Sequence, residues 1–366
     1  MRRINLIWFL VILMFPKPEG VAQTGGRGKK PSTAPKADIV RIVDSARRTV
    51  DLPKPVTRAI VVYTQLLLAM KAIGVEDDQI VGLDEFTRSQ YRDVLPAVKN
   101  KPVVGRNLFS LDVEKIMSLD AQVIMVTPTT LKQMPNLETQ LGKVGMKVVC
   151  LDFDMRGVND VLDVLGKMFG KQDRAAEFSR FWFSKLELVR DRISQLPEAN
   201  RVSVYWENTN TPFDTINKSS QGAEILIQAG GRNIAHDIVG TKVDAEWVVA
   251  RNPDFIIKYP MGAAYQGGLG QTDVAPFQAM REEIMRRPGF NQIKAVQNGQ
   301  VYIVSQLMKT GLFGNVAVCC LAKILYPELF ADLNPEAHFE EMARKYLGLD
   351  LAVIKGVLVY PVPWRR

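Results

Sequence analysis

The sequence contains little histidine and little cysteine, and this excludes several kinds of site. Only two histidines occur in 366 residues, His236 and His338, so we do not expect a histidine-rich zinc or manganese centre. The three cysteines, Cys150, Cys319 and Cys320, are too few for a disulfide framework. We expect them to be buried small side chains, with a disulfide between Cys150 and one of the other two as the alternative in an oxidising compartment.

Neither sign of charge dominates the chain. The 47 Lys and Arg residues face 39 Asp and Glu residues, which gives a net charge of +8. There is no Lys/Arg block beyond Arg27–Lys30 and no recognised nucleic-acid motif, so a nucleic-acid partner is not expected. Hydrophobic residues make up 47% of the chain, which is typical of globular proteins, and its length corresponds to about two domains.

The N-terminus has the pattern of a secretory signal peptide. Arg2 and Arg3 precede an apolar stretch from Ile4 to Phe15, and Gly20-Val21-Ala22 is a small-x-small cleavage site. The alternative is a membrane anchor, but the apolar stretch is shorter than the roughly 20 residues that a span needs. We therefore predict a signal peptide at residues 1–22 and a flexible, Gly-, Lys- and Pro-rich tether at residues 23–37.

The compartment follows from that leader. No cysteine lies near residue 22, so a lipobox-type lipid anchor is not expected. No later segment reaches the roughly 18 uninterrupted apolar residues of a membrane span. We expect a protein that is free in the periplasm, and a monomer.

Short apolar segments alternate with helical patterns on both sides of one long helix. Residues 38–44 and 47–52 alternate as a hairpin does, and later runs such as Ala59–Val62 lack alternation, which is typical of buried parallel strands. Gln172–Leu196 has helical spacing throughout and would be roughly 37 Å long. The predicted fold is α/β: two lobes with mostly parallel sheets, at 38–156 and 198–366, joined by connecting helices at 157–197.

Each lobe contains a similar short unit. Ser110–Ile124 resembles Val243–Ile257, because in both a glutamate opens a short helix and an apolar strand follows. The glutamates are Glu114 and Glu246. From the residues alone, each is explained as a negative charge at a helix N-terminus, which is worth roughly 0.3–1 kcal/mol.

Four stretches together resemble one protein family. They are Asp44–Pro53 with Arg58–Val62, the Glu114 and Glu246 units, the Glu224–Ala235 helix end, and Arg287–Tyr302. Their order and spacing over residues 38–330 resemble the periplasmic substrate-binding proteins of ABC importers for iron–siderophore, haem and cobalamin, the class with a helical connector. The first unit departs from the family pattern, with Asp120-Ala121-Gln122 where Pro-Asp is usual.

This resemblance implies a ligand cleft between the lobes and small movements on closure, because a single helix bends little. It also implies that Glu114 and Glu246 dock onto arginines of a dimeric membrane permease. It implies no resident cofactor, since any iron or cobalt belongs to the metal-chelate ligand.

Ligand contacts are predicted by position, because ligands of open α/β sheets bind beyond the carboxyl ends of the strands. Aromatic and basic groups there suit a large, flat or anionic ligand. The predicted contacts are Tyr63 and Thr64 after a strand at 59–62, Arg106 and Asn107 after one at 103–105, Trp206 and Glu207 at the end of one at 201–206, Tyr259 after one at 255–258, and Lys309 after one at 300–304.

The predicted function is a periplasmic receptor that captures an iron chelate of siderophore type and delivers it to an ABC importer permease. Haem or a corrinoid such as cobalamin is the alternative cargo. A secreted enzyme is a further alternative, but we find no G-x-S-x-G, no H-E-x-x-H and no Cys–His pair in a suitable setting. The prediction is therefore a binding protein without catalytic residues.

Overall fold

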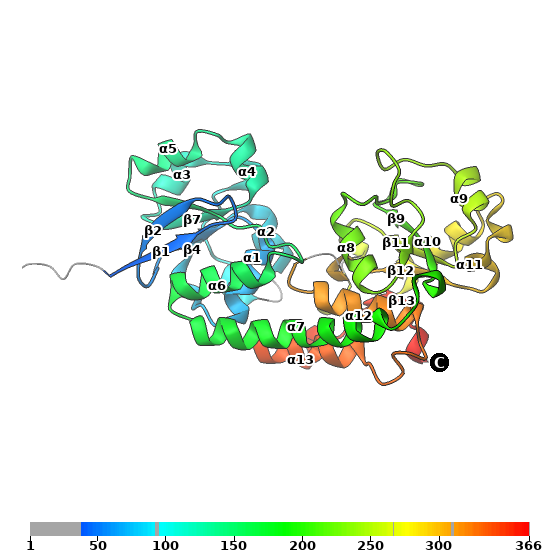
Figure 1. Cartoon of the computed structure of the whole chain (residues 1–366). Helices are drawn as coiled ribbons and strands as arrows, with labels where there is room; N and C mark the ends of the chain where they lie inside the picture. Colours follow the sequence, from blue (N-terminus) through cyan, green and yellow to red (C-terminus); the bar gives the residue numbers. More distant parts are fainter. Residues whose placement is uncertain (1–37, 92–94, 266, 309–310, 366) are drawn as a thin grey trace, which may run out of the picture. The chain divides into compact units, whose positions relative to one another are not determined.

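The computed structural model describes residues 38–91, 95–265, 267–308 and 311–365 (Figure 1). The predicted signal peptide and tether, residues 1–37, lie outside the described residues, as does Lys309. Residues 38–366 group into one compact unit by their contacts. No described helix combines the length and the apolar composition that crossing a membrane requires.

The N-terminal lobe is built on a four-stranded parallel sheet. Its strand order is β4-β3-β7-β8, and a separate hairpin, β1 with β2, precedes it. A second small hairpin, β5 with β6, follows β4. The strands are β1 (Ile39–Val43), β2 (Thr49–Pro53), β3 (Ala59–Val61), β4 (Ile80–Leu83), β5 (Gly105–Asn107), β6 (Ser110–Leu111), β7 (Val123–Val126) and β8 (Lys147–Cys150).

Helices cover both faces of this sheet because its strands are apolar on both sides. On one face Ile60, Ile124 and Val148 pack with α3 and α5, and on the other Val61 and Met125 join the core that includes α1 and α6. The helices are α1 (Thr64–Ala72), α2 (Glu85–Tyr91), α3 (Val113–Met117), α4 (Pro128–Gln133), α5 (Leu137–Gly142) and α6 (Val158–Phe169).

The C-terminal lobe has a five-stranded sheet with the order β10-β9-β11-β12-β13. Its first four strands are parallel, and β13 pairs antiparallel with β12. The strands are β9 (Ser203–Asn208), β10 (Arg232–Asn233), β11 (Phe255–Tyr259), β12 (Val301–Val304) and β13 (Val359–Tyr360); the helices are α8 (Gln221–Gln228), α9 (Ala245–Arg251), α10 (Ala275–Met285), α11 (Lys294–Gln297), α12 (Gly314–Leu325), α13 (Pro335–Leu347) and α14 (Leu351–Ile354).

The connecting helix α7 (Gln172–Ser194) is 23 residues long and confirms the predicted long helix, two residues shorter at its end. It starts directly after α6, which ends at Gly170 in the left-handed conformation that glycine adopts readily. Trp182 in the middle of α7 is fully buried, and its indole Nε1 donates to the carbonyl of Leu312 at 2.7 Å.

The connection is a group of helices and not α7 alone. Helix α12 contacts both α7 and α13, and α13 contacts α1 of the N-terminal lobe (Figure 1). The amide of Leu312 also donates to Oε1 of Gln65 on α1 at 2.9 Å. As a result, one continuous core contains Val61 of the first sheet, Trp182 of α7 and Trp206 of the second sheet.

Three predicted strand boundaries are wrong, and the differences affect the site. Val103 makes only an isolated bridge with Leu83, so the predicted Val103–Gly105 strand is absent and Arg106 and Asn107 lie on β5 instead. Strand β9 runs to Asn208, two residues past the predicted end, and β11 includes Tyr259. The short antiparallel β13 was not predicted.

The cysteines are as predicted. All three are free and buried. Burial raises the pKa of the Cys150 thiol to about 11 and that of Cys319 to about 12. Thiols in such surroundings are inert, small apolar side chains.

Candidate functional site

Tyr63 and Thr64 lie at the carboxyl end of β3, as predicted. Tyr63 precedes the first turn of α1 and is half-buried. Burial, with the charges of Asp152 and Asp154, raises the pKa of its phenol to about 12, so it stays neutral at physiological pH. Thr64 is buried, and its hydroxyl is hydrogen-bonded to that of Thr87 at 3.2 Å. Tyr63 is therefore the more accessible of the two.

Asp84 lies beside them and was missed by the sequence analysis. It directly follows β4, the neighbour of β3, and is 1% exposed. Oδ2 accepts from the amide of Thr87 at 3.2 Å, whereas Oδ1 has no partner among the described residues. Burial raises the pKa of this carboxyl. The rule that selected Tyr63, a polar residue directly after a parallel strand, applies equally to Asp84.

Arg106 and Asn107 lie on the β5–β6 hairpin at the same end of the lobe. Arg106 is exposed, and Oδ1 of Asn107 accepts from the amide of Phe109 at 2.9 Å, which shapes the turn. Two exposed aromatic rings accompany them: Phe109 is 49% exposed, and Phe86 on α2 is 57% exposed. Helix α2 contacts β5, so these rings belong to one region of the surface.

Trp206 and Tyr259 come together in a pocket of about 170 Å³ at the carboxyl ends of β9 and β11. Tyr259 pairs in register with Asn208, so both aromatic side chains project from the same face of the sheet. The hydroxyl of Tyr259 donates to the carbonyl of Gln306 at 3.3 Å. We call this the α8 pocket, and its lining consists of Trp206, Asn208, Ile216, Ser220, Gly222, Ile225, Tyr259 and Met308.

Trp206 has an unsatisfied hydrogen-bond donor at this pocket. The residue is 3% exposed, and its indole Nε1 has no partner among the described residues. Gly222, in the first turn of α8, lies against the indole edge that carries this nitrogen, because a Cβ built on Gly222 would lie 3.8 Å from Trp206 Cε2. Buried N–H groups normally have a hydrogen-bond partner, so the unpartnered indole N–H of Trp206 is unusual.

Glu207 does not line the pocket, and its predicted ligand contact needs correction. Because it lies inside β9, the alternation of side chains sends it to the face opposite Trp206. It is fully buried, and Oε1 accepts from Lys258 Nζ at 2.7 Å. Arg287 binds both carboxylate oxygens, at 2.6 and 2.9 Å. The side chain is thus occupied by a buried ion-pair network.

This network keeps Glu207 ionised. Burial by itself would raise the pKa of its carboxyl, but hydrogen bonds from Arg287 and the charge of Lys258 lower it below the ordinary value. Oε2 also accepts from the amide of Phe213 at 3.1 Å, which holds the loop after β9. Glu207 therefore supports the pocket from behind the sheet.

Glu114 and Glu246 occupy equivalent positions in the two lobes. Each is the second residue of a short helix whose preceding aspartate caps it: Asp112 accepts from the amide of Lys115 at 2.9 Å, and Asp244 from that of Trp247 at 2.7 Å. Both glutamates are exposed. Within the described ranges, no hydrogen bond or ion pair involves either carboxylate. The aspartates already cap the helices, so the glutamates are available to a partner.

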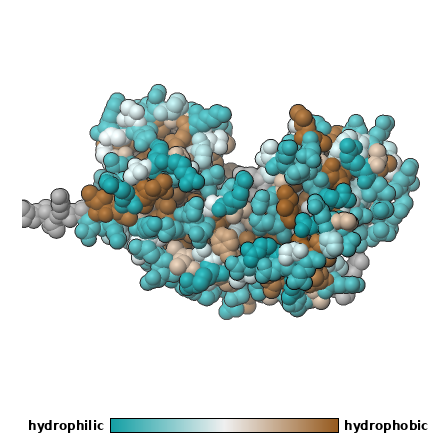
Figure 2. Space-filling model, viewed as in Figure 1, coloured by the Kyte–Doolittle hydropathy of each residue, from teal (hydrophilic) through white to brown (hydrophobic). Residues whose placement is uncertain are grey.

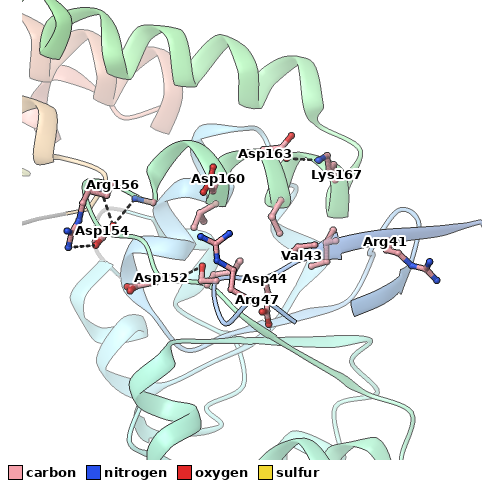
Figure 3. Close-up of a pocket in the computed structure, with 16 residues that line it drawn as sticks. Arg41, Val43, Asp44, Arg47, Asp152, Asp154, Arg156, Asp160, Asp163 and Lys167 are labelled. Carbon is pink, nitrogen blue, oxygen red and sulfur yellow. Dashed lines mark hydrogen bonds and ion pairs between the residues drawn. The ribbon is translucent and has the colours of Figure 1, made fainter. Parts of the chain in front are cut away.

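A larger groove of about 530 Å³ lies beside the β1–β2 hairpin (Figure 3). None of the predicted contact residues that the structure describes lines it. Its carboxylates mainly organise the chain: Asp154 accepts from the amides of Arg156 and Gly157, Asp163 pairs with Lys167 at 2.6 Å, and buried Asp44 binds Arg48 at 2.7 Å. Nowhere in the described ranges do three or more His, Cys, Asp and Glu residues form a group suited to a metal ion.

Two α/β sheets with polar and aromatic residues at their carboxyl ends, joined through a long helix, define a two-lobed ligand-binding protein. The chain belongs to the periplasmic binding protein family, whose model matches residues 60–307. Proteins of this family bind small-molecule ligands and work with ABC transporter permeases, and they are not enzymes. No curated protein sequence matches the chain.

Solved structures of this family have the same fold. A TroA-like periplasmic binding protein, FepB from Veillonella parvula, has a TM-score of 0.76 and 22% identity, covering 87% of this chain and 99% of its own. The molybdate-binding MolA of Haemophilus influenzae has a TM-score of 0.68 and 19% identity, and the match covers 87% of this chain and 100% of MolA. A periplasmic heme binding protein from Pseudomonas aeruginosa has a TM-score of 0.56 and 21% identity, and the match covers 75% of this chain and 94% of that protein. At these identities the likeness shows the fold.

Proposed function

We propose that this protein is a periplasmic receptor that captures an iron chelate of siderophore type and delivers it to an ABC importer permease. The observation that carries delivery is the equivalence of Glu114 and Glu246: one exposed, unpaired carboxylate per lobe, each at the same position of an Asp-capped helix. Two such carboxylates suit the two halves of a dimeric permease through charge-assisted bonds to arginine.

The cargo assignment is supported by the side chains at the carboxyl ends of the two sheets. Tyr63, exposed Arg106 and the aromatic α8 pocket offer a neutral phenol, a cation and flat apolar surfaces. A metal chelate with aromatic or anionic oxygen groups complements this combination. Haem or a corrinoid is the second candidate cargo, because the rings of Trp206 and Tyr259 also suit a macrocycle.

Delivery is tested with the double variant Glu114→Ala/Glu246→Ala. We expect it to bind cargo normally and to lose permease-dependent uptake, since both carboxylates are exposed and each contributes at most about 1 kcal/mol to its helix. The matched control is Glu187→Ala/Glu341→Ala, which removes two exposed glutamates from α7 and α13 and should transport normally. Full uptake by the first double variant would contradict the docking roles.

Cargo is tested by thermal unfolding against separate ferric siderophores, haem and cobalamin. A ligand at about 100 times its Kd adds roughly 2.7 kcal/mol of stability, which raises Tm by several degrees for a chain of this size. A rise with a ferric siderophore supports the primary proposal. A rise in Tm with haem or cobalamin alone would make that compound the cargo in place of a siderophore. No rise in Tm with any of these ligands would contradict the proposal of a metal-chelate cargo.

A further inference from the structure

The α8 pocket has the volume of a single ring. Its volume is about 170 Å³, and an apolar protein cavity of about 150 Å³ holds one benzene molecule. Ile216, Ile225 and Met308 provide apolar surface, and Trp206 and Tyr259 provide two aromatic rings. The hydroxyl of Tyr259 already donates to the carbonyl of Gln306, so Tyr259 contributes its aromatic ring to the pocket and not a hydrogen-bond donor. These walls suit a planar, apolar group.

Hydrogen-bond donors also lie at this pocket. Helix α8 begins there, and the first N–H groups of a helix have no partner within the helix. Ser220 precedes the helix but does not cap it, because its hydroxyl interacts with the amide and side chain of Asn217. The positive end of α8 and the unpartnered Nε1 of Trp206 thus converge at Gly222, which lines the pocket.

Among the described residues that line the α8 pocket, none has an acidic side chain. The amide of Asn208 lies at its edge, in register with Tyr259, and can add a further donor. An anion would therefore meet donors and no like charge in this pocket. Glu207, the nearest acidic residue along β9, points to the other face of the sheet and is neutralised by Lys258 and Arg287.

We propose that the α8 pocket binds an aromatic acid: one planar ring that carries an anionic oxygen, presented as an arm of the cargo. The ring lies between the apolar walls, and the oxygen accepts from Trp206 Nε1–H and from the N-terminus of α8. This inference rests on the proposed receptor function, which it narrows to cargo with an aryl carboxylate or a chemically similar arm.

The test is a titration of the whole protein with 4-fluorobenzoate. The protein carries [15N]tryptophan, and the indole N–H signals are followed by NMR. A new hydrogen bond to an anion should move the Trp206 signal downfield and leave Trp182 unchanged, since Trp182 already donates to Leu312. We expect a Kd in the low millimolar range, as is usual for a fragment of about ten heavy atoms.

Fluorobenzene and acetate separate the two parts of the proposal. Fluorobenzene has the ring without the anionic oxygen, and acetate has the anion without the ring, so both should bind at least about tenfold more weakly than 4-fluorobenzoate. Equal binding of fluorobenzene would overturn the role of the donors. Equal binding of acetate would overturn the role of the ring. No movement of the Trp206 signal with 4-fluorobenzoate would overturn the site.

Two variants and a control place the fragment by the broadening of its fluorine signal. Gly222→Ala should abolish binding, because the new Cβ enters the pocket at 3.5 Å from Ile216 Cδ1, a contact that the fold tolerates. Gly142→Ala is the control, since its Cβ meets nothing within 4 Å on α5. Trp206→Phe keeps a ring and removes the donor, and should weaken binding about tenfold.

Failure of this proposal is distinguishable from failure of the receptor function. If the fragment does not bind but a metal chelate still raises Tm, the receptor stands and the aromatic-acid arm is wrong. If Gly222→Ala and Gly142→Ala bind the fragment equally, the fragment lies elsewhere and the α8 pocket assignment is wrong.

Discussion

The fully buried carboxylate of Glu207 has four donor groups around it, one of which is the hydroxyl of Tyr205 at 3.2 Å. The other three are Lys258 on β11, Arg287 just after α10, and the amide of Phe213 in the loop after β9. The Arg287 guanidinium also lies 5.0 Å from the centre of the Phe213 ring. Removing one member of such a buried network leaves charges without partners, which is far more destabilising than losing a surface pair.

Glu207→Ala should therefore lower the free energy of unfolding by about 3–5 kcal/mol. Lys258 on β11 and Arg287 just after α10 would be left as buried cations without the carboxylate that they share. The measurement is urea unfolding followed by circular dichroism. The matched control is Glu283→Ala, which removes the exposed partner of the same arginine and should change stability by less than about 1 kcal/mol. Similar losses for both variants would contradict the network's role.

His338 is a buried titratable residue that links stability to pH. It is 3% exposed between α13 and α12, where its Nε2 contacts the side-chain amide of Asn315 at 2.9 Å, and Lys185 is the charge that acts on it. Burial lowers the pKa of the imidazole from 6.5 to about 4. The folded protein thus keeps His338 neutral at a pH where the unfolded chain protonates it.

Unfolding therefore takes up a proton between about pH 6.5 and pH 4, and the stability from this group falls as the pH drops through that window. The loss reaches about 3 kcal/mol at the acid end, and above pH 6.5 the group contributes no pH dependence. Urea unfolding at several pH values measures it. His338→Gln should flatten the profile, whereas His236→Gln should not, and a profile unchanged by His338→Gln would refute the assignment.

The position of an individual candidate residue could be predicted only where the end of its strand was predicted correctly. Tyr63, Trp206 and Tyr259 lie at the carboxyl ends of parallel strands, where the pattern places them, and their ligand contacts stay predictions. Glu207 was misassigned because β9 extends two residues further than its apolar pattern indicates, and inside a strand neighbouring side chains point to opposite faces. The missing partner of Trp206 depends on packing and has no signal in the sequence.

At the scale of elements, the close approach of α7 to the end of α8 depends on one glycine. Gly230 follows α8 with φ +85°, a backbone conformation that side-chain-bearing residues rarely adopt. A Cβ at this position would lie 2.6 Å from Cδ1 of Ile193 on α7 and 3.0 Å from the ring of Tyr326. The connecting helix and the C-terminal lobe can meet here only because the side chain is absent.

Gly230→Ala should accordingly destabilise the protein by about 1–3 kcal/mol, through backbone strain and displacement of Ile193. Gly142→Ala on α5 makes a useful comparison, because its Cβ would have free space, and we expect it to be neutral or slightly stabilising. Thermal and urea unfolding of both variants provide the measurement. Equal stability of the two variants would show that α7 has more freedom at this contact than the structure indicates.

Elements with strong local patterns were predictable, and weakly patterned ones were not. The parallel strands and α7 were found from apolar runs and from helical spacing over more than 20 residues. Strand β13 has two residues and exists because it pairs with β12, so its formation is decided by tertiary contacts. Tertiary contacts also decide the structure at Val103, which makes a single bridge with Leu83 although its apolar neighbours predict a strand.

The surface in view is mostly hydrophilic, with brown areas that include the region of the β1–β2 hairpin (Figure 2). Ile39 and Val43 of β1 are 65% and 54% exposed.

At the scale of the whole molecule, the arrangement of the hydrophobic core says more about how the lobes are joined than the surface does. A single core joins buried side chains of both sheets through α7, α12 and α13, so the lobes have no boundary between separate cores.

This shared core predicts that the two lobes unfold together. If α7 alone joined two independent domains, each domain would melt at its own temperature, because contacts across the connection would be few. Here Trp182 packs in the same core as Val61 and Trp206, and Gln65 binds the segment before α12. We expect one calorimetric transition in which the calorimetric and van't Hoff enthalpies agree. The variant Gln65→Ala should keep a single transition at slightly lower temperature, because the core remains intact. Two separated transitions in the unmodified protein would show that the lobes are thermodynamically independent despite their common core.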